Sequence, residues 1–201
     1  MKDKIKIFRK WFTENNIYVF ILLFSFFPFC LLADEVSGPV SQTGQTLLHA
    51  IGDDAELRRG MPWPTPRFKD NGDGTVTDHL TSLVWMKNAD CFGQQTWADA
   101  FIKVAGLNSN KETCVVYTNK TYTDWRVPNI QELSSLIDFG QFLPALSTDS
   151  PFVGAHSDRY WSSTASASSP SYAWFVDLYN GSVEHYAKAN TYYVWPVRGR
   201  Q

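Results

Sequence analysis

The densest group of metal-binding side-chain types lies in RFKDNGDGTVTD, residues 67–78, where three aspartates and an asparagine surround two glycines. An EF-hand loop needs oxygen ligands at positions 1, 3 and 5, glycine at 6 and glutamate at 12. A loop that starts at Asp70 has glycines at positions 3 and 5, where ligands are needed, and a loop that starts at Lys69 has a cation at position 1. Neither register fits an EF-hand. The stretch is therefore predicted to be a strand, an Asp73-Gly74 turn and a second strand, with aspartates accepting from turn amides. A non-EF calcium site at Asp70, Asp73 or Asp78 is the alternative.

The sequence contains no recognisable catalytic motif. Ser162 and Ser163 lack the G-x-S-x-G context of a hydrolase nucleophile. Two carboxylates for glycoside hydrolysis must lie at a set distance, which a sequence does not display, and no pair is selected here. No metal site, cofactor or enzymatic activity is predicted. The histidines are scattered singly, at positions His49, His79, His156 and His185.

The N-terminus has the layout of a secretory signal. Basic residues precede an apolar run from Ile17 to Ala33, and Pro28 interrupts the run near its end. We expect residues 1–33 to be a cleaved signal peptide, with an uncleaved membrane anchor or lipid attachment at Cys30 as alternatives. The protein is then exported to the periplasm, the cell surface or the medium. Any membrane contact is expected through this segment alone.

Removal of the signal changes the charge and the cysteine count. The segment holds five of the 18 Lys and Arg and two of the 20 Asp and Glu, so the rest has a net charge of −5. Without a basic run, nucleic acid is not an expected partner. An oxidising compartment favours a disulfide between Cys91 and Cys114. A redox pair or metal site is the alternative, although there is no C-x-x-C spacing.

The rest of the chain divides into an extended lead-in, residues 34–66, and a domain, residues 67–201. TWADAFIKVAGLN, residues 96–108, predicts a helix capped by Thr96. Its apolar face is expected to hold Trp97, Phe101, Val104 and Ala105. A second helix follows Asn129, which forms a capping box with Glu132, and its apolar stripe is Ile130, Leu133, Leu136 and Ile137.

Four strand-like segments follow a long irregular stretch. They are residues 160–165, 172–178, 182–188 and 192–199, and Asn180-Gly181 predicts a two-residue hairpin turn between the middle two. Strands and helices in this order predict an α+β fold, with two helices packed on a small twisted antiparallel sheet.

Several spaced motifs resemble one family. PRFKDNGDGTVTDHLTSLVWMKNADC, DWRVPNIQELSSLID, YWSST and YYVWPVRG together are similar to the Lcl C-terminal domain family, long catalogued as a domain of unknown function. The resemblance implies a C-type-lectin-like fold with a long loop region, related to formylglycine-generating enzymes, in an exported bacterial protein. The collagen-like adhesin that names the family is associated with sulfated polysaccharides. This sequence has no collagen repeats.

The resemblance also suggests two sites to look for. Sugar-binding C-type lectins hold calcium with an adjacent Trp-Asn-Asp group, whereas this chain has only Trp174, Asp177 and Asn180, spaced apart. Formylglycine-generating enzymes use a reactive cysteine pair near the end of the domain, and no cysteine follows Cys114. Neither activity is therefore expected.

Aromatic residues suggest a binding surface. Most of the seven tryptophans after residue 33 are expected in the core. In SVEHYAK, alternation puts Val183, His185 and Ala187 on one face and Glu184, Tyr186 and Lys188 on the exposed face. The binding surface is predicted on the sheet and the long loop. Its predicted ligand-binding residues are Tyr160, Tyr179, Glu184, Tyr186, Lys188 and Tyr192.

These observations predict an exported, non-catalytic binding module that contacts polysaccharide or a surface protein, as an adhesin does. An envelope enzyme acting on exported proteins or cell-wall sugars and a purely structural envelope protein are the alternatives. The charge disfavours a sulfated polysaccharide unless the arginines gather on one face. Those arginines are Arg58, Arg59, Arg126, Arg159, Arg198 and Arg200.

Overall fold

The computed structural model describes residues 40–118 and 121–199. These residues belong to one compact unit, Ser37–Gln201. The predicted signal peptide, residues 1–33, lies outside the described residues. Within the described part, no helix has both the length and the apolar character needed to cross a bilayer.

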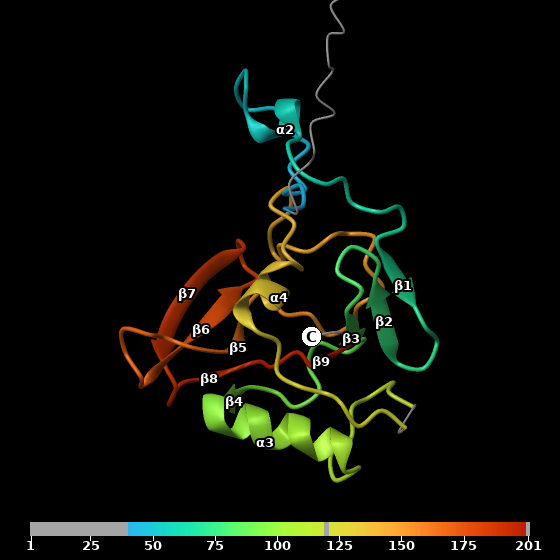
Figure 1. Cartoon of the computed structure of the whole chain (residues 1–201), viewed down its shortest axis with the longest axis vertical. Helices are drawn as coiled ribbons and strands as arrows, with labels where there is room; N and C mark the ends of the chain where they lie inside the picture. Colours follow the sequence, from blue (N-terminus) through green and yellow to red (C-terminus); the bar gives the residue numbers. More distant parts are fainter. Residues whose placement is uncertain (1–39, 119–120, 200–201) are drawn as a thin grey trace, which may run out of the picture. The chain divides into compact units, whose positions relative to one another are not determined.

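The described residues form small antiparallel sheets and short helices (Figure 1), so the mixed α+β class is confirmed. One sheet has the order β1 (Phe68–Asp70), β2 (Thr75–Asp78), β3 (Val84–Met86) and β9 (Val197–Arg198). Another pairs β4 (Gln95–Thr96) with β8 (Thr191–Tyr192), and a third consists of β5 (Arg159–Ala165), β6 (Tyr172–Asp177) and β7 (Ser182–Ala187). The helices are α2 (Asp54–Leu57), α3 (Trp97–Asn108) and α4 (Ile130–Ser134).

The predicted hairpin at residues 67–78 is confirmed as β1 and β2. Its turn uses positive φ angles at Gly72 (78°) and Gly74 (86°). A Cβ at Gly74 would lie 2.2 Å from the carbonyl oxygen of Val116, so glycine also permits close packing of the turn on a distant loop. The aspartates accept from turn amides as predicted, Asp70 from Gly72 and Asp73 from Thr75, both at 3.0 Å.

Both predicted helices are present with their predicted caps. Thr96 caps α3, and Asn129 and Glu132 form the complete capping box of α4. The predicted apolar face of α3 is partly wrong, because Phe101 and Ala105 are exposed and the buried residues are Ala100, Val104, Gly106 and Leu107. Phe101 instead packs edge-on against Trp97, with ring centroids 4.7 Å apart. The helix has apolar residues on two adjoining faces, so its sequence pattern does not decide which face is buried. Tertiary contacts decide it.

The C-terminal segment corrects another prediction. Residues 192–199 were expected to form one strand, but Tyr192 pairs in β8 and Val197–Arg198 pair in β9, in a different sheet. Between them Trp195 is fully buried, and its indole N–H donates to the Met86 carbonyl at 2.7 Å. Pro196, which has no N–H to donate, also breaks the strand.

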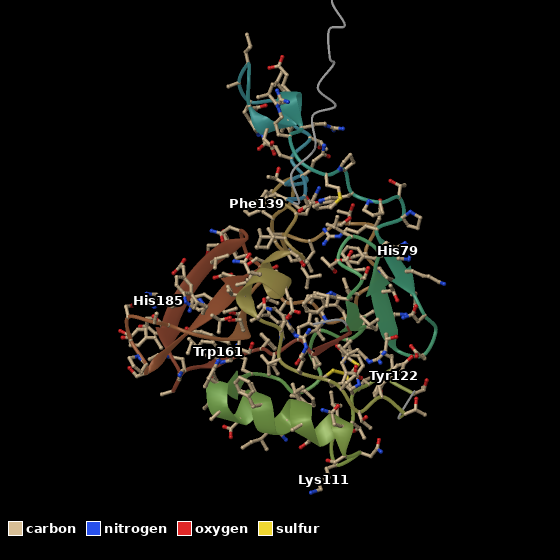
Figure 2. All side chains as sticks on the ribbon, in the orientation of Figure 1. His79, Lys111, Tyr122, Phe139, Trp161 and His185 are labelled. Carbon is tan, nitrogen blue, oxygen red and sulfur yellow. A yellow bond between two sulfur atoms is a disulfide. The ribbon has the colours of Figure 1, made fainter. Side chains whose placement is uncertain are left out.

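The β6–β7 turn is longer than predicted. Asp177 pairs with Ser182, so four residues rather than Asn180-Gly181 alone form the connection. In the sheet order β5-β6-β7, strand β7 lies at the edge. Figure 2 shows His185 on this outer strand, whereas Trp161 lies in the interior.

The core is confined to the predicted domain. Every buried hydrophobic side chain of the described residues lies between Phe68 and Val197, and the largest are Trp85, Trp161 and Trp195. The predicted disulfide between Cys91 and Cys114 is present in the structure. Its 23-residue separation corresponds to about 3 kcal/mol of stabilisation by chain entropy.

The lead-in is more structured than predicted. Asp53 caps the short helix α2, and Ser41 forms an isolated parallel bridge with Met61. The lead-in also contacts the loop after α4, since the Phe139 amide donates to the Thr43 carbonyl at 2.9 Å. The described part of the lead-in contributes no side chain to the hydrophobic core. These contacts nevertheless place it beside a loop that is almost one hundred residues further along the sequence.

Candidate binding site

The three aspartates of residues 67–78 serve the fold. Asp70 pairs with Lys87 at 2.6 Å, and Asp73 also accepts from the Thr75 hydroxyl at 2.6 Å. Asp78 is fully buried and accepts two bonds from Arg67. The described residues contain no cluster of three or more His, Cys, Asp or Glu side chains that could hold a metal.

Two predicted binding residues are in the core, so their predicted place on an exposed surface is wrong. Tyr160 is fully buried, and its hydroxyl accepts from the His156 amide at 2.9 Å. Tyr192 is 6% exposed because its ring packs between Trp161 and Phe175, at centroid distances of 4.4 and 5.1 Å. Both side chains contribute their large aromatic area to the core, so they are not available at the surface.

The other four predicted residues are at least partly accessible but spread along the hairpin. Tyr179 lies in the β6–β7 turn, whereas Tyr186 lies opposite Ala173, toward the other end of the two strands. Glu184 is exposed, and the Lys188 ammonium donates to the Pro170 carbonyl and lies 4.0 Å from the Trp97 ring centroid. The predicted alternation is imperfect, because Val183 on the opposite face is also 40% exposed. A ligand contact at these four residues stays a prediction.

The spaced lectin-like residues are engaged locally. Trp174 stacks on His185, with centroids 4.9 Å apart and planes at 20°. Asp177 accepts from the Tyr179 amide, and the Asn180 side chain accepts from the Ser182 amide. Two of the three side chains therefore hold the hairpin turn.

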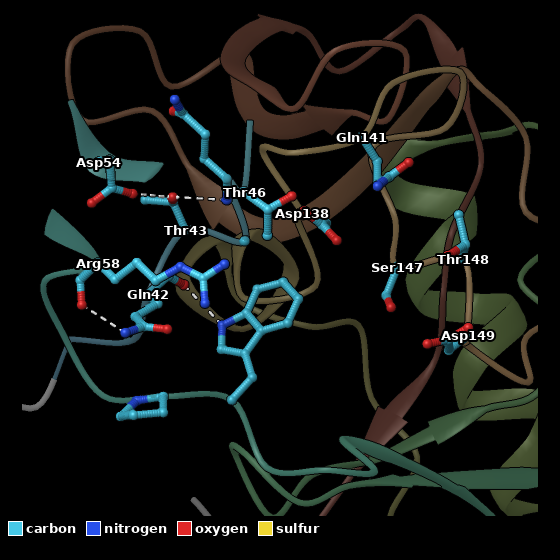
Figure 3. Close-up of a pocket in the computed structure, with 14 residues that line it drawn as sticks. Gln42, Thr43, Thr46, Asp54, Arg58, Asp138, Gln141, Ser147, Thr148 and Asp149 are labelled. Carbon is cyan, nitrogen blue, oxygen red and sulfur yellow. Dashed lines mark hydrogen bonds between the residues drawn. The ribbon is translucent and has the colours of Figure 1, made fainter. Parts of the chain in front are cut away.

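A pocket that the sequence did not predict lies between the lead-in and the loop after α4. Its volume is about 410 Å³, and most of its lining residues are polar. Figure 3 shows Thr43, Asp54 and Arg58 on one side and Ser147 and Asp149 on the other. We call this pocket the polar compartment; it is lined by residues 42–46, Asp54, Arg58, Pro62, Trp63, Asp138, Gln141 and residues 147–149.

Local hydrogen bonds hold the lead-in side of the polar compartment. The Thr43 hydroxyl donates to the Asp54 carboxylate, and the Gln42 amide group donates to the Arg58 carbonyl at 2.6 Å. The Trp63 indole N–H donates to the Gln42 carbonyl at 2.8 Å. The ring of Trp63 is thereby fixed at a lining position, with its N–H already satisfied.

Asp138 is the most buried carboxylate of the polar compartment. Its side-chain oxygen accepts from the Gly140 amide at 2.9 Å, and burial raises its pKa above the ordinary value of 3.8. Gly44 packs directly against it, with φ at +90° and space so close that a Cβ would lie 2.2 Å from Oδ1 of Asp138. A substitution at Gly44 would therefore push the lead-in away from the loop.

A second, adjoining pocket is also lined by Trp63. It has a volume of about 280 Å³ and is lined by residues 63–68, Ser147 and Asp149, so it shares three lining residues with the polar compartment. We call it the Arg67 compartment, and the two together the Trp63 cleft.

Arg67 is held from several directions. Its Nε and Nη2 each donate to Asp78 at 3.1 Å, and Nη2 also donates to the Ser135 carbonyl at 2.5 Å. The guanidinium carbon lies 4.4 Å from the Trp63 ring centroid and 4.6 Å from that of Phe68. Nη1 is buried and has no hydrogen-bond partner among the described residues.

The cleft was not predicted, because residues 34–66 were expected to be extended. The usable local signal is Asp53-x-x-Glu56, in which Asp53 accepts from the Glu56 amide and begins α2. No local signal brings the lead-in to the loop at residues 138–149.

The sequence comparison defines the class of protein. The model of the Lcl C-terminal domain matches residues 74–198, and the chain belongs to this family. No curated protein matches the chain. The match begins after Arg67, so the cleft combines lead-in residues outside the matched span with Asp138, Gln141 and residues 147–149 inside it.

Proposed function

We propose that the protein is a non-catalytic glycan-binding module and that the Trp63 cleft is its binding site. The observation that carries the proposal is an indole ring, held by its N–H bond, that lines two adjoining compartments beside side chains that both donate and accept hydrogen bonds. A sugar presents an apolar ring face to an aromatic side chain and hydroxyl groups to polar ones. Concave sites with a few convergent polar groups are the usual form of small-ligand sites.

The charges favour a neutral glycan. Asp54, Asp138 and Asp149 line the polar compartment, against the single cation Arg58. A sulfate or carboxylate group would be repelled there, whereas hydroxyl groups can donate to these carboxylates.

The arginines elsewhere do not supply a free basic face. Arg126 pairs with Glu132, Arg159 with Asp177 and Arg198 with Asp124. Arg200 lies outside the described residues. These pairings weigh against a sulfated polysaccharide as the ligand.

We also propose that the α+β domain is C-type-lectin-like and that the protein acts after export, in the periplasm, at the cell surface or in the medium. The disulfide supports export, because such bonds persist in oxidising compartments. A surface protein that carries glycans would be bound through the same cleft.

One observation favours an enzyme as the second candidate. Asp138 has a raised pKa and lines the same compartment as Asp54 and Asp149. A carboxyl group with a raised pKa is the type of general acid that glycosidases use. Release of reducing sugar from any oligosaccharide that binds, abolished in Asp138→Asn, would establish that activity.

A glycan-array screen of the exported chain, with and without calcium, tests the proposal. Trp63→Ala is expected to weaken binding at least about tenfold, because it removes the aromatic face of the cleft. Trp174→Ala is the matched control, since it removes a partly exposed tryptophan of the β5–β7 sheet and should leave binding unchanged. Binding to no glycan would contradict the proposal, and loss in Trp174→Ala alone would move the site to the sheet.

A further inference from the structure

The Arg67 compartment has an unusual combination of groups. Trp63, two prolines and Phe68 line it, yet a buried arginine, Arg67, is also among its lining residues. Arg67 is only 6% exposed. Of its three guanidinium nitrogens, Nη1 is the one without a hydrogen-bond partner among the described residues. A buried donor without an acceptor is unfavourable, and a suitable ligand oxygen removes that penalty.

The surroundings of Arg67 determine which oxygen fits. Asp78 already neutralises the guanidinium charge through two hydrogen bonds, and Asp149 also lines the compartment. A second carboxylate or a sulfate would therefore meet more negative than positive charge. A neutral carbonyl oxygen avoids this repulsion and still accepts the free N–H.

The apolar lining adds a second requirement. A group that carries a carbonyl oxygen next to a small apolar part satisfies both the Nη1 donor and the surface of Phe68 and the prolines. An acetamido group has this composition. Its size suits a side compartment, while the ring that carries it would occupy the adjoining polar compartment.

We propose that the Arg67 compartment receives the acetamido group of an N-acetylhexosamine unit, and this inference rests on the proposed glycan-binding function. The carbonyl oxygen accepts from Nη1 of Arg67, and the methyl group packs on Phe68 and the prolines. The sugar ring lies against Trp63, and its hydroxyl groups meet the polar compartment. Nη1 is shielded from solvent, so direct contact requires the residues that line the compartment to rearrange locally on binding.

Calorimetric titration with two β-1,4-linked trisaccharides tests this assignment. One is the trimer of N-acetylglucosamine and the other the trimer of glucose, which differ at C2 alone. The wild-type chain is expected to bind the N-acetyl trimer about tenfold or more tightly than the glucose trimer. Equal affinities that are both lost in Trp63→Ala would overturn the inference and leave the proposed function standing. Binding of neither trimer would contradict this inference, and the array screen then decides the proposed function separately.

Two variants locate the acetamido group. Thr65→Phe fills the Arg67 compartment from an exposed position and keeps both residues of the Arg67–Asp78 pair, and it should reduce the preference for the N-acetyl trimer to less than about twofold. Arg67→Lys should have the same effect, because lysine lacks the planar fork. Gln141→Ala, which lines only the polar compartment, should weaken both trimers equally. A full preference retained in folded Thr65→Phe would place the acetamido group elsewhere, even if Arg67→Lys failed to fold.

Discussion

At the scale of single residues, two buried charges define the Trp63 cleft. Arg67 is held by hydrogen bonds to Asp78 and by contacts of its guanidinium with the rings of Trp63 and Phe68. Asp138 has one backbone donor, from Gly140, and its burial is incompletely compensated, so its pKa is raised. The two groups attract each other, because the Arg67 charge partly offsets the effect of burial on Asp138.

Asp138 should make the fold less stable as the pH rises. Burial raises the native-state pKa of Asp138 above the ordinary value of 3.8. At pH values between the unfolded-state pKa and the raised native-state pKa, the native state therefore binds more protons than the unfolded state. The free energy of unfolding contributed by this group therefore falls as the pH increases through the raised pKa. Asp138→Asn keeps an oxygen that accepts from Gly140 and should lack this fall.

Urea unfolding of the wild type and Asp138→Asn between about pH 3 and pH 7 measures the difference. The variant should gain stability relative to the wild type as the pH increases across this range. A relative gain by the wild type would contradict the assignment of a raised pKa.

At the scale of elements, α4 shows how a very short helix is maintained. Five residues are too few for a stable isolated helix, so its ends depend on caps. Glu132 accepts from the Asn129 amide at 2.8 Å and from both terminal nitrogens of Arg126, at 2.6 and 2.7 Å. The helix positions Leu133 in the core, and Asp138 follows shortly after its end.

Glu132→Gln is expected to destabilise the fold by about 1–2 kcal/mol at neutral pH, because it weakens the cap and removes the ion pair with Arg126. Burial by itself would raise the pKa of Glu132, but the bonds from Arg126 and Asn129 outweigh it and lower the pKa below 4.5. The stabilisation is therefore present above pH 4.5 and is lost as the pH falls through the lowered native pKa.

Denaturant unfolding at neutral and acidic pH checks this expectation. Glu112→Gln is the control, since the Lys103–Glu112 pair is about one-third exposed and should contribute less than about 1 kcal/mol. Equal effects of the two substitutions at neutral pH would show that the capping box is not the source of the stability.

At the scale of the whole molecule, the described residues separate into a core and a cleft-forming addition. The buried hydrophobic side chains lie within residues 68–197, which nearly coincide with the family match over residues 74–198. Residues 40–62 contribute hydrogen bonds and one side of the polar compartment without joining that core. On the proposed function, the lead-in is therefore the segment in which substitutions would change ligand preference without loss of the fold.

A chain that starts at Met61 is expected to fold and to lose the proposed glycan binding. It retains every buried hydrophobic residue and lacks Thr43, Asp54 and Arg58, so its stability should fall by no more than about 2 kcal/mol. Circular dichroism and urea unfolding report the fold, and the array screen reports binding. A folded truncated chain that binds as tightly as the full exported chain would exclude the polar compartment as the binding site.

The sequence by itself determined the local features: the caps at Thr96 and Asn129, the glycine turn of the first hairpin, the disulfide pairing and the membership of the family. Caps and turns are readable because their donors and acceptors lie within a few residues of one another. The tertiary structure alone decided that Tyr160 and Tyr192 are buried, that residues 192–199 divide between two sheets, and that Thr43 meets Phe139. These outcomes depend on packing between distant segments, where the burial of large aromatic side chains outweighs the alternation of a single strand.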